Sequence, residues 1–275
     1  MSRRILVTGG NSGIGLALCA QLAEDGAFVY LGARTAEKAE AAVASLVASS
    51  PALAGLLAPL AIDPGFDASV ASAAASLSGV QLYAIVNNAG TGLGHQPAAA
   101  EVLNVNALAP KRETEALQPL LAPGGRVVNV GSGAASSFVK TQPEEVQRLL
   151  CNPPDAWAPL AALLVAKQAD AAFMQEPYPG PYGLSKAVLA AYTMLMAKAA
   201  PAVLFSCVSP GFIATRMTAG LGASKQPEEG TGSIKHALFA PLAGNGWYYG
   251  SDGVRSPYHF MRNPGEPPYD GTPPF

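Results

Sequence analysis

Tyr182 and Lys186 carry a phenol and an ammonium group four residues apart, at the start of an apolar segment. In a helix this spacing places both side chains on one face, about 5–6 Å apart at Cβ. A nearby cation favours the phenolate and lowers a tyrosine pKa from its reference value of about 10. The pair can therefore act as a general acid and base near neutral pH. The same spacing is also common on ordinary solvated helix faces.

A glycine-rich turn, Thr8-Gly-Gly-Asn-Ser-Gly-Ile-Gly15, lies between the first predicted strand and the first predicted helix. Its glycines permit a tight turn, and the helix N-terminus offers free N–H groups to a pyrophosphate. A strand–turn–helix glycine cluster can also be purely structural, but the position after the first strand favours dinucleotide binding. A second cluster, Gly90-Thr-Gly-Leu-Gly94, precedes no apolar helix and is predicted to be a loop.

The end of the second predicted strand, Leu31-Gly-Ala-Arg-Thr35, bears on the choice between NAD and NADP. A carboxylate at this place would bind the ribose 2′-hydroxyl, whereas an arginine accommodates a 2′-phosphate. Here Arg34 is present and a carboxylate is not, and Asn11, Ser12 and Thr35 can add neutral donors. NADP(H) is therefore the expected cofactor; the alternative is that Arg34 is a surface residue that begins a helix.

The elements that position these residues follow from the alternation of short aliphatic runs with longer alanine-rich segments. The predicted strands are Ile5–Thr8, Phe28–Gly32, Leu57–Ile62, Ala84–Asn87, Arg126–Val130, Val203–Val208 and Trp247–Gly250. The predicted helices are Gly13–Glu24, Ala36–Val47, Ser69–Ser78, Glu101–Leu121 and Leu184–Ala199. This order predicts βαβ units in a doubly wound, Rossmann-type parallel sheet flanked by helices. Since no repeat or linker divides it, the chain (1–275) is expected to be a single domain.

Two segments depart from the alternation, the first being an insertion at about residues 138–181. Thr141-Gln-Pro-Glu144 matches a capping box that would open one helix, and Asp155 would cap a second one. We expect these helices to cover the Tyr182 helix, with Trp157 or Phe173 at the substrate mouth; the alternative is a surface excursion remote from the chemistry. The second segment is the tail, at about 255–275, which is rich in Tyr and Pro. It is predicted to be an extended wrap or a disordered end.

Composition excludes several classes of protein. With 13% charged residues and a formal net charge of −2, the chain has no basic footprint for nucleic acid. Its three cysteines are too few and too scattered for a disulfide framework or a zinc site, and no metal is expected. The longest apolar stretch is interrupted by Lys198 and Pro201, so no membrane span is predicted. Because the first strand begins directly after Met-Ser-Arg-Arg, no signal peptide and a cytoplasmic location are expected.

Five separated motifs occur together in a specific order. They are the glycine turn, Asn87-Asn-Ala-Gly90, Ser132 after Val127-Val-Asn-Val-Gly, the Tyr182/Lys186 pair, and Pro210-Gly-Phe-Ile-Ala-Thr215. Together they resemble the short-chain dehydrogenase/reductase family over nearly the whole chain. The insertion is similar to that of the monomeric carbonyl-reductase branch, in which it covers the surface that relatives use to dimerise. The resemblance therefore implies a monomeric oxidoreductase.

The resemblance also implies catalytic roles. Tyr182 would exchange a proton with the substrate oxygen, and Ser132 would orient and polarise that oxygen. Lys186 would hold the nicotinamide ribose and lower the tyrosine pKa. Asn106 would support a water-mediated proton relay, with Asn104 as the alternative.

Cofactor contacts are implied along the same motifs. Asp63 would lie near the adenine, Asn88 and Gly90 would line the adenosine side, and Ile213 and Thr215 would contact the carboxamide. The full expected set is Gly9, Asn11, Ser12, Gly13, Ile14, Gly15, Arg34, Thr35, Asp63, Asn88, Ala89, Gly90, Tyr182, Lys186, Pro210, Gly211, Ile213 and Thr215.

The residues expected at the substrate are His95, Ala134, Tyr178 and Met217. This mostly apolar set without clustered arginines favours a small neutral carbonyl or alcohol over an anionic substrate. The expected reaction is NADPH-dependent reduction of a ketone, aldehyde or quinone. Alcohol oxidation, enone reduction and a non-catalytic NADP sensor are the alternatives, and the presence of Tyr182 favours carbonyl chemistry.

Overall fold

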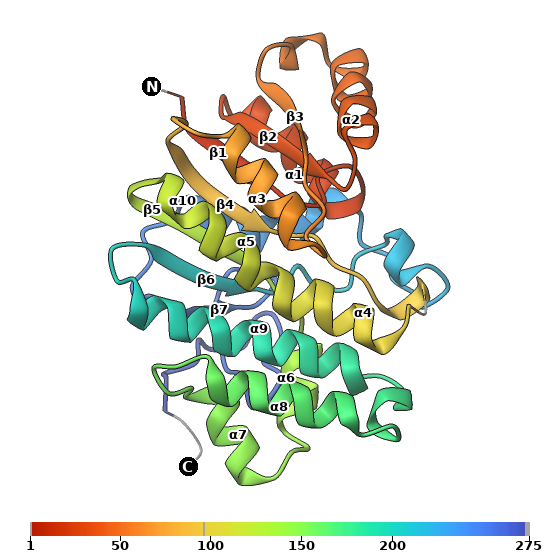
Figure 1. Cartoon of the computed structure of the whole chain (residues 1–275), viewed down its shortest axis with the longest axis vertical. Coiled ribbons are helices and arrows are strands. Elements are labelled where there is room, and N and C mark those ends of the chain that lie inside the picture. Colours follow the sequence, from red (N-terminus) through yellow and green to blue (C-terminus); the bar gives the residue numbers. More distant parts are fainter. Residues whose placement is uncertain (1, 96, 273–275) are drawn as a thin grey trace.

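A computed structural model describes residues 2–95 and 97–272, which are built around one eight-stranded sheet (Figure 1). The strand order is β3-β2-β1-β4-β5-β6-β7-β8, parallel from β3 to β7, with β8 antiparallel to β7. The strands are β1 Arg4–Val7, β2 Phe28–Ala33, β3 Leu57–Ala61, β4 Leu82–Asn87, β5 Leu121–Val130, β6 Leu204–Val208, β7 Trp247–Tyr249 and β8 Arg255–Ser256. This is the doubly wound α/β fold expected from the sequence.

Helices connect the parallel strands and cover both faces of the sheet. They are α1 Gly13–Glu24, α2 Ala36–Ser49, α3 Asp67–Ser76, α4 Ala99–Leu103, α5 Ala109–Leu117, α6 Ala134–Val139, α7 Glu144–Cys151, α8 Ala158–Ala169, α9 Gly180–Ala199 and α10 Gly232–Phe239. One apolar cluster joins the sheet to α1, α2 and α10, and another joins it to α3, α5 and α9. Successive residues of β1 divide between them, because strand side chains alternate between faces: Ile5 and Val7 belong to the first cluster and Leu6 to the second.

The direction of winding reverses between β1 and β4, which are neighbours in the sheet but distant in the chain. Ligands of open α/β sheets bind outside the carboxyl ends of the strands at such a switch point. The glycine turn follows β1 and the Asn87–Gly90 turn follows β4, so both turns meet there. The topology thus brings together two of the motifs singled out from the sequence.

The helix predicted over Glu101–Leu121 is present as a continuous helical segment, but it is not α-helical throughout. A π-helical turn, Asn104–Leu108, lies between α4 and α5, and a 3₁₀ turn, Gln118–Leu120, leads directly into β5. The π turn turns Asn106 inward, where it is fully buried. Such turns often occur at functional sites.

Both caps predicted in the insertion are wrong. α7 begins after Pro143 with no side-chain cap, and the Thr141 hydroxyl instead donates to the Phe138 carbonyl (2.8 Å) at the end of α6. α8 begins after Trp157 with no side-chain cap, and the Asp155 carboxylate lies 3.3 Å from Lys198 Nζ on α9. In each case the side chain that the local pattern assigned to a cap instead interacts with a residue of a neighbouring helix.

The helices of the insertion lie at the opposite end of the molecule from β1–β3 and cover α9 (Figure 1). Trp157 stacks edge-on against Tyr192 of α9, at 5.7 Å between ring centroids. Phe173 is buried against Phe138 of α6. The prediction that either ring lines the substrate mouth is therefore wrong, because Phe173 lies in the core between the insertion and α9, and the half-buried Trp157 packs against α9.

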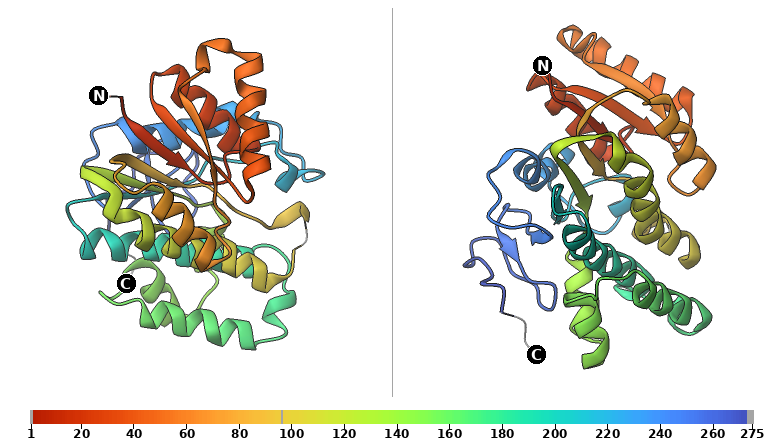
Figure 2. Two further views of the ribbon diagram at one scale, coloured as in Figure 1. Left: turned by 45° about the horizontal axis from the view of Figure 1, so that its top comes forward. Right: turned by 60° about the vertical axis from the view of Figure 1, so that its left-hand side comes forward.

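The C-terminal tail contains one short strand, β8, and otherwise runs as extended chain along the side of the molecule (blue in Figure 2). Its first half is well anchored: Tyr258 is buried and stacks on Tyr248 of β7 at 5.2 Å between centroids. Of the two predictions for the tail, the described residues up to Thr272 show the extended wrap. No helix in the described ranges is both long and apolar enough to cross a bilayer.

Candidate active site

The glycine turn after β1 is held in a shape that only small residues permit. Gly9 has a φ of +62°, in the left-handed region that favours glycine. A methyl group on Gly15 would lie 2.3 Å from the Gly9 carbonyl oxygen and 2.4 Å from Asn88 Nδ2. Ser12 is the N-cap residue of α1, yet its side chain makes no capping hydrogen bond. The first N–H groups of α1 therefore face the turn without a side-chain acceptor, an arrangement that fits a pyrophosphate.

Hydrogen bonds tie this turn to the one after β4. The Thr8 hydroxyl accepts from the backbone N–H groups of Asn88 and Ala89, both at 3.2 Å. Asn88 Nδ2 donates to the Thr8 carbonyl at 2.9 Å. Asn88, expected to line the adenosine side, thus uses its amide to join the two strand ends.

At the end of β2, Arg34 is exposed and forms no hydrogen bond or ion pair with any described residue. Thr35 caps α2 by accepting from the Lys38 N–H (3.4 Å). Asp63, after β3, accepts from the Gly65 N–H (3.0 Å). Each of these side chains lies at the edge where the carboxyl ends of the strands meet.

The structure distinguishes between Asn106 and Asn104, the two candidates for the proton relay that sequence analysis left open. Asn106 Oδ1 accepts from the Thr91 N–H (2.9 Å), and its Nδ2 donates to the Thr91 carbonyl (2.8 Å) and to Ser185 Oγ (3.2 Å). It therefore links the loop after β4 to α9. Asn104 faces the other way, donating to the Gly65 carbonyl at 3.2 Å. Of the two, only Asn106 reaches the Tyr182 helix.

Lys186 is buried, and its ammonium donates to the Val130 carbonyl at the end of β5 (2.8 Å). Burial lowers the pKa of Lys186 to about 8. A methyl group on Gly90 would lie 3.8 Å from Lys186 Nζ and 3.3 Å from Asn106 Oδ1. Gly90 thus brings the backbone of the β4 turn against both polar side chains.

Tyr182 lies one helical turn before Lys186 and interacts with Ser132, whose hydroxyl also accepts from the Ala134 N–H (3.2 Å). Burial raises the pKa of Tyr182 to about 12, and the hydrogen bond with Ser132 opposes this only in part. Lys186 is not among the groups that lower this pKa, so the lowering expected from the Tyr182/Lys186 spacing is wrong. Removing the phenolate from water costs more than its neighbours return.

Sequence analysis did not single out Gly92, because it predicted only a loop for residues 90–94. Its φ of +134° is strained for any residue with a side chain. A methyl group there would lie 2.6 Å from Tyr182 Cδ2 and 3.1 Å from Cε2. The backbone at Gly92 therefore forms one wall against the tyrosine ring.

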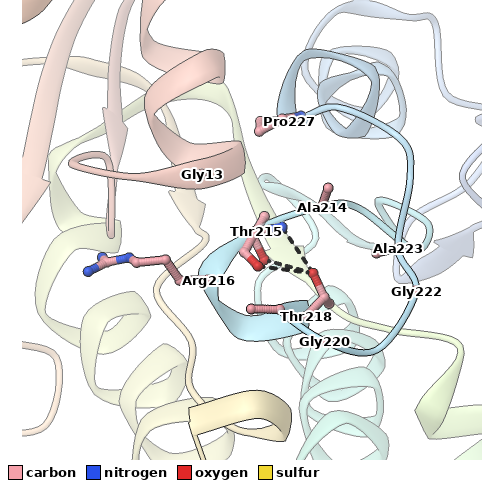
Figure 3. Close-up of a pocket in the computed structure, with 10 residues that line it drawn as sticks. Gly13, Ala214, Thr215, Arg216, Thr218, Gly220, Gly222, Ala223 and Pro227 are labelled. Atoms are coloured by element: carbon pink, nitrogen blue, oxygen red, sulfur yellow. Dashed lines mark hydrogen bonds between the residues drawn. The ribbon is translucent and has the colours of Figure 1, made fainter.

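The segment after β6 closes the other side of the glycine turn over a cavity of about 440 Å³ lined by Gly13, Thr215 and Arg216 among others (Figure 3). Thr215 and Thr218 form a reciprocal capping box, which fixes the segment that follows Ile213. Arg216 points away from this pair, and its Nη2 donates to Ser12 Oγ at 3.2 Å. The Arg216 guanidinium thus reaches the glycine turn, a contact that sequence analysis did not predict.

The four residues expected at the substrate lie in different surroundings. Met217 is close to Gly90, since a methyl group there would lie 3.8 Å from its Cε. Tyr178 is exposed and acts electrostatically on Tyr182. Ala134 is buried, with its carbonyl against Gly183 of α9. The side chain of His95 lies outside the described residues.

Glu113 on α5 is a buried carboxyl that sequence analysis did not single out. It is 1% exposed, and its Oε1 has no hydrogen-bond partner among the described residues. Burial raises its pKa to about 8, although the Thr8 hydroxyl acts in the opposite direction. Glu113 thus stands as a neutral acid behind the Thr8 junction at neutral pH. In the described ranges, no group of His, Cys, Asp or Glu has the arrangement of a metal site.

Comparison with known proteins agrees with this geometry. The short chain dehydrogenase family model matches residues 3–143. Salutaridine reductase of Papaver bracteatum is 27% identical, over 90% of this chain and 94% of its own. The solved structure of salutaridine reductase from Papaver somniferum is 26% identical and superposes with a TM-score of 0.77, covering 90% of this chain and 99% of that one.

The fold is also that of an NADPH-bound carbonyl reductase from chicken, with a TM-score of 0.67 at 21% identity over 93% of this chain and 99% of that one. The matched residues 3–143 include the glycine turn, the Asn87–Gly90 turn, the π turn with Asn106 and Ser132. On this match and on the doubly wound sheet that carries it, the chain belongs to the short chain dehydrogenase family of oxidoreductases.

Proposed function

We propose that the protein reduces the carbonyl of a neutral ketone, aldehyde or quinone to an alcohol with NADPH, and that Tyr182 is the general acid. The observation that carries this proposal is the meeting of Tyr182 with Ser132, one turn before the buried Lys186 and against the wall at Gly92. A phenol and a hydroxyl that face one point can both bond one substrate oxygen.

The cofactor side supports NADP(H). Its reduced nicotinamide, when bound, supplies the hydride. The open N–H groups of α1 would bind the pyrophosphate, and the exposed Arg34, with no carboxylate at the end of β2, would pair with a 2′-phosphate. Arg216 would exchange the Ser12 hydroxyl for a phosphate oxygen, because guanidinium–phosphate bonds are the stronger ones. Ile213 and Thr215, fixed by the capping box, would meet the carboxamide.

The chain's own groups would handle the proton. Ser132 would orient the carbonyl oxygen, and Tyr182 would donate its proton to that oxygen as negative charge develops on it. Lys186 would hold the ribose hydroxyls. Asn106, which joins the Thr91 loop to α9, would hold the water through which Tyr182 is protonated again.

The protonation state of the tyrosine suits a proton donor, which supports reduction as the proposed reaction. With its pKa raised to about 12, Tyr182 is a phenol at neutral pH and is ready to donate. A developing alkoxide is a stronger base than phenolate, so the transfer is favourable in the direction of reduction. Alcohol oxidation would need the phenolate, which burial disfavours. The names of the salutaridine reductases agree with reduction.

The insertion supports a monomeric state. α7 and α8 cover the surface of α9 with a continuous apolar cluster that includes Leu150, Leu160 and Leu164. A helix pair already seated on that face leaves no room there for a second subunit. Light scattering at micromolar concentration should give a mass near 28.0 kDa, and a dimer mass would contradict this.

The proposal is tested by following the loss of NADPH absorbance with a panel of ketones, aldehydes, quinones and enones. Tyr182→Phe should lower turnover of the best substrate by at least about 100-fold, the usual share of a general acid. NADPH binding, measured by fluorescence, should stay within a few-fold of wild type. Turnover of Tyr182→Phe near the wild-type rate would contradict the role of Tyr182, and tight NADPH binding without turnover of any substrate would favour a sensor.

A further inference from the structure

The C-terminal tail is fixed on its inner side by several independent contacts. The buried guanidinium of Arg262 pairs with Asp252, and it also donates to Ser256 Oγ (2.9 Å) and to the Glu266 carbonyl (2.7 Å). The Pro257 carbonyl accepts from Ser136 Oγ on α6 (3.2 Å). Residues 257–262 are therefore attached both to the end of the sheet and to the helix that follows Ser132.

These anchors place Met261 beside the catalytic serine. A methyl group on Gly133 would lie 3.0 Å from both Sδ and Cε of Met261, so the thioether rests on the residue that directly follows Ser132. Met261 is nevertheless 49% exposed. One side of its side chain touches the active-site backbone, and the other is open.

A second exposed apolar group lies on the tyrosine side. Tyr178 is 58% exposed and precedes Tyr182 by four residues, just before α9. Met261 lies against Gly133, the residue that follows Ser132. An exposed apolar side chain therefore accompanies each of the two hydroxyl-bearing residues, one along the chain and the other in space.

The basic groups of residues 255–262 are paired, stacked on a ring or neutral. The Arg262 guanidinium pairs with Asp252 and donates hydrogen bonds to backbone carbonyls of the tail. Arg255 stacks over the Trp247 ring, with 3.8 Å between Cζ and the ring centroid. Burial lowers the pKa of His259, so this residue is uncharged at neutral pH. What the tail offers next to Ser132 is a polarizable, uncharged surface.

We propose that Met261 is a specificity-determining residue: with Tyr178 it grips the apolar ring of a cyclic or aromatic carbonyl substrate whose oxygen points at Ser132 and Tyr182. The tail is thereby a wall of the substrate site. This inference rests on the proposed carbonyl-reductase function and adds the part of the substrate that the catalytic residues do not touch. Thioether–ring contacts suit such a grip, because the flexible methionine adapts to flat surfaces.

The test compares two ketones, bicyclic 2-tetralone and small acetone, with NADPH and the full-length enzyme. Met261→Gln, which keeps the length but adds a polar end, and Met261→Ala should lower kcat/KM for 2-tetralone by about tenfold, mainly through KM. For acetone the change should be less than twofold. Met261→Leu, which keeps the apolar volume, should stay within threefold of wild type on both. Equal losses on both ketones, or no loss on 2-tetralone, would overturn the proposal.

A footprinting measurement separates this inference from the proposed function. Hydrogen peroxide converts an exposed methionine to its sulfoxide, and peptide mass spectrometry reports the rate for Met261. With NADP⁺ present, saturating 2-tetralone should slow oxidation of Met261 at least threefold, whereas acetone should not. If the wild-type enzyme reduced no ketone but 2-tetralone still protected Met261, the proposed function would fail and the wall would stand. Turnover of 2-tetralone without protection would have the opposite meaning.

Discussion

Two walls enclose the Tyr182 and Lys186 side chains, and they are made of different material. The wall from the ends of β1 and β4 is backbone, brought close at Gly15, Gly90 and Gly92. The second wall is built from side chains: Met217, whose Cε lies beside Gly90, and Met261, whose thioether lies against Gly133. Backbone held by hydrogen bonds cannot move aside, whereas a thioether changes rotamer at little cost. On the proposed function, the backbone side would meet the nucleotide, an invariant partner, and the side-chain side would meet the substrate, a variable one.

The sharpest way to break this comparison is to add one methyl group to each wall. Gly92→Ala would press on the Tyr182 ring at 2.6 Å and also needs a strained φ. Because a displacement of about 1 Å in a catalytic group can cost roughly 100-fold, we expect kcat to fall by about that factor. Gly133→Ala meets only the mobile end of Met261, at 3.0 Å, and should cost less than threefold. Steady-state kinetics measures both, and equal losses would erase the distinction.

The nucleotide side has its own test in Gly15→Ala. The new methyl group would meet the Gly9 carbonyl at 2.3 Å, where the chain has no room to relax. Overpacking of this kind costs about 1–3 kcal/mol. If that cost falls on the bound state, NADPH affinity drops by about 10- to 100-fold. Fluorescence titration measures the affinity, with Gly232→Ala, which adds a methyl group in open space at a position without a positive φ, as the matched control.

Two arginines should divide the recognition of the cofactor. Arg34→Gln should weaken NADPH binding by about tenfold and leave NADH unchanged, because charge-assisted bonds to a 2′-phosphate exist only with NADPH. Arg216→Gln should weaken both cofactors by a similar factor, since its partner Ser12 lies at the turn for the shared pyrophosphate. Arg4→Gln, an exposed change on β1, is the control. A larger effect of Arg34→Gln on NADH than on NADPH would contradict the assignment.

The smallest effect on turnover, and a clear one on stability, is expected for Glu113→Gln. The folded protein keeps this carboxyl protonated up to about pH 8, while the unfolded chain releases the proton near its ordinary value of 4.5. Between these values the folded state binds more protons, so the free energy of unfolding falls as the pH rises. Glu113→Gln should flatten that slope in urea unfolding from pH 5 to 8 with kcat within twofold. An unchanged slope would show that Glu113 is ionised.

Patterns in the sequence correctly predicted helices whose ends are determined by residues close by in the chain. α1 runs from Gly13 to Glu24 as predicted, because a glycine turn and an apolar run define both of its ends. The capping patterns at Thr141 and Asp155 gave wrong predictions, because each side chain has another partner in the fold. Thr141 bonds to the Phe138 carbonyl, and Asp155 pairs with Lys198.

What the sequence could not show depends on contacts between distant segments. Gly92 meets Tyr182, Arg216 meets Ser12 and Met261 meets Gly133, and no spacing within either partner announces the other. Asn106 lies between these cases. Its motif singled it out, but the π turn that buries it and its bonds to Thr91 and Ser185 required the fold.

The anchoring of the tail has a consequence for how such an enzyme can diverge. Arg262 holds the segment in place through Asp252 and Ser256, while its neighbour Met261 faces the opening. Support and contact are thus assigned to separate, adjacent positions. On the proposed role of Met261, a change at residue 261 would alter the compounds accepted and leave the sheet, the nucleotide turn and the proton donor as they were. New substrate ranges would then be reachable by single substitutions, without a loss of the reaction in between.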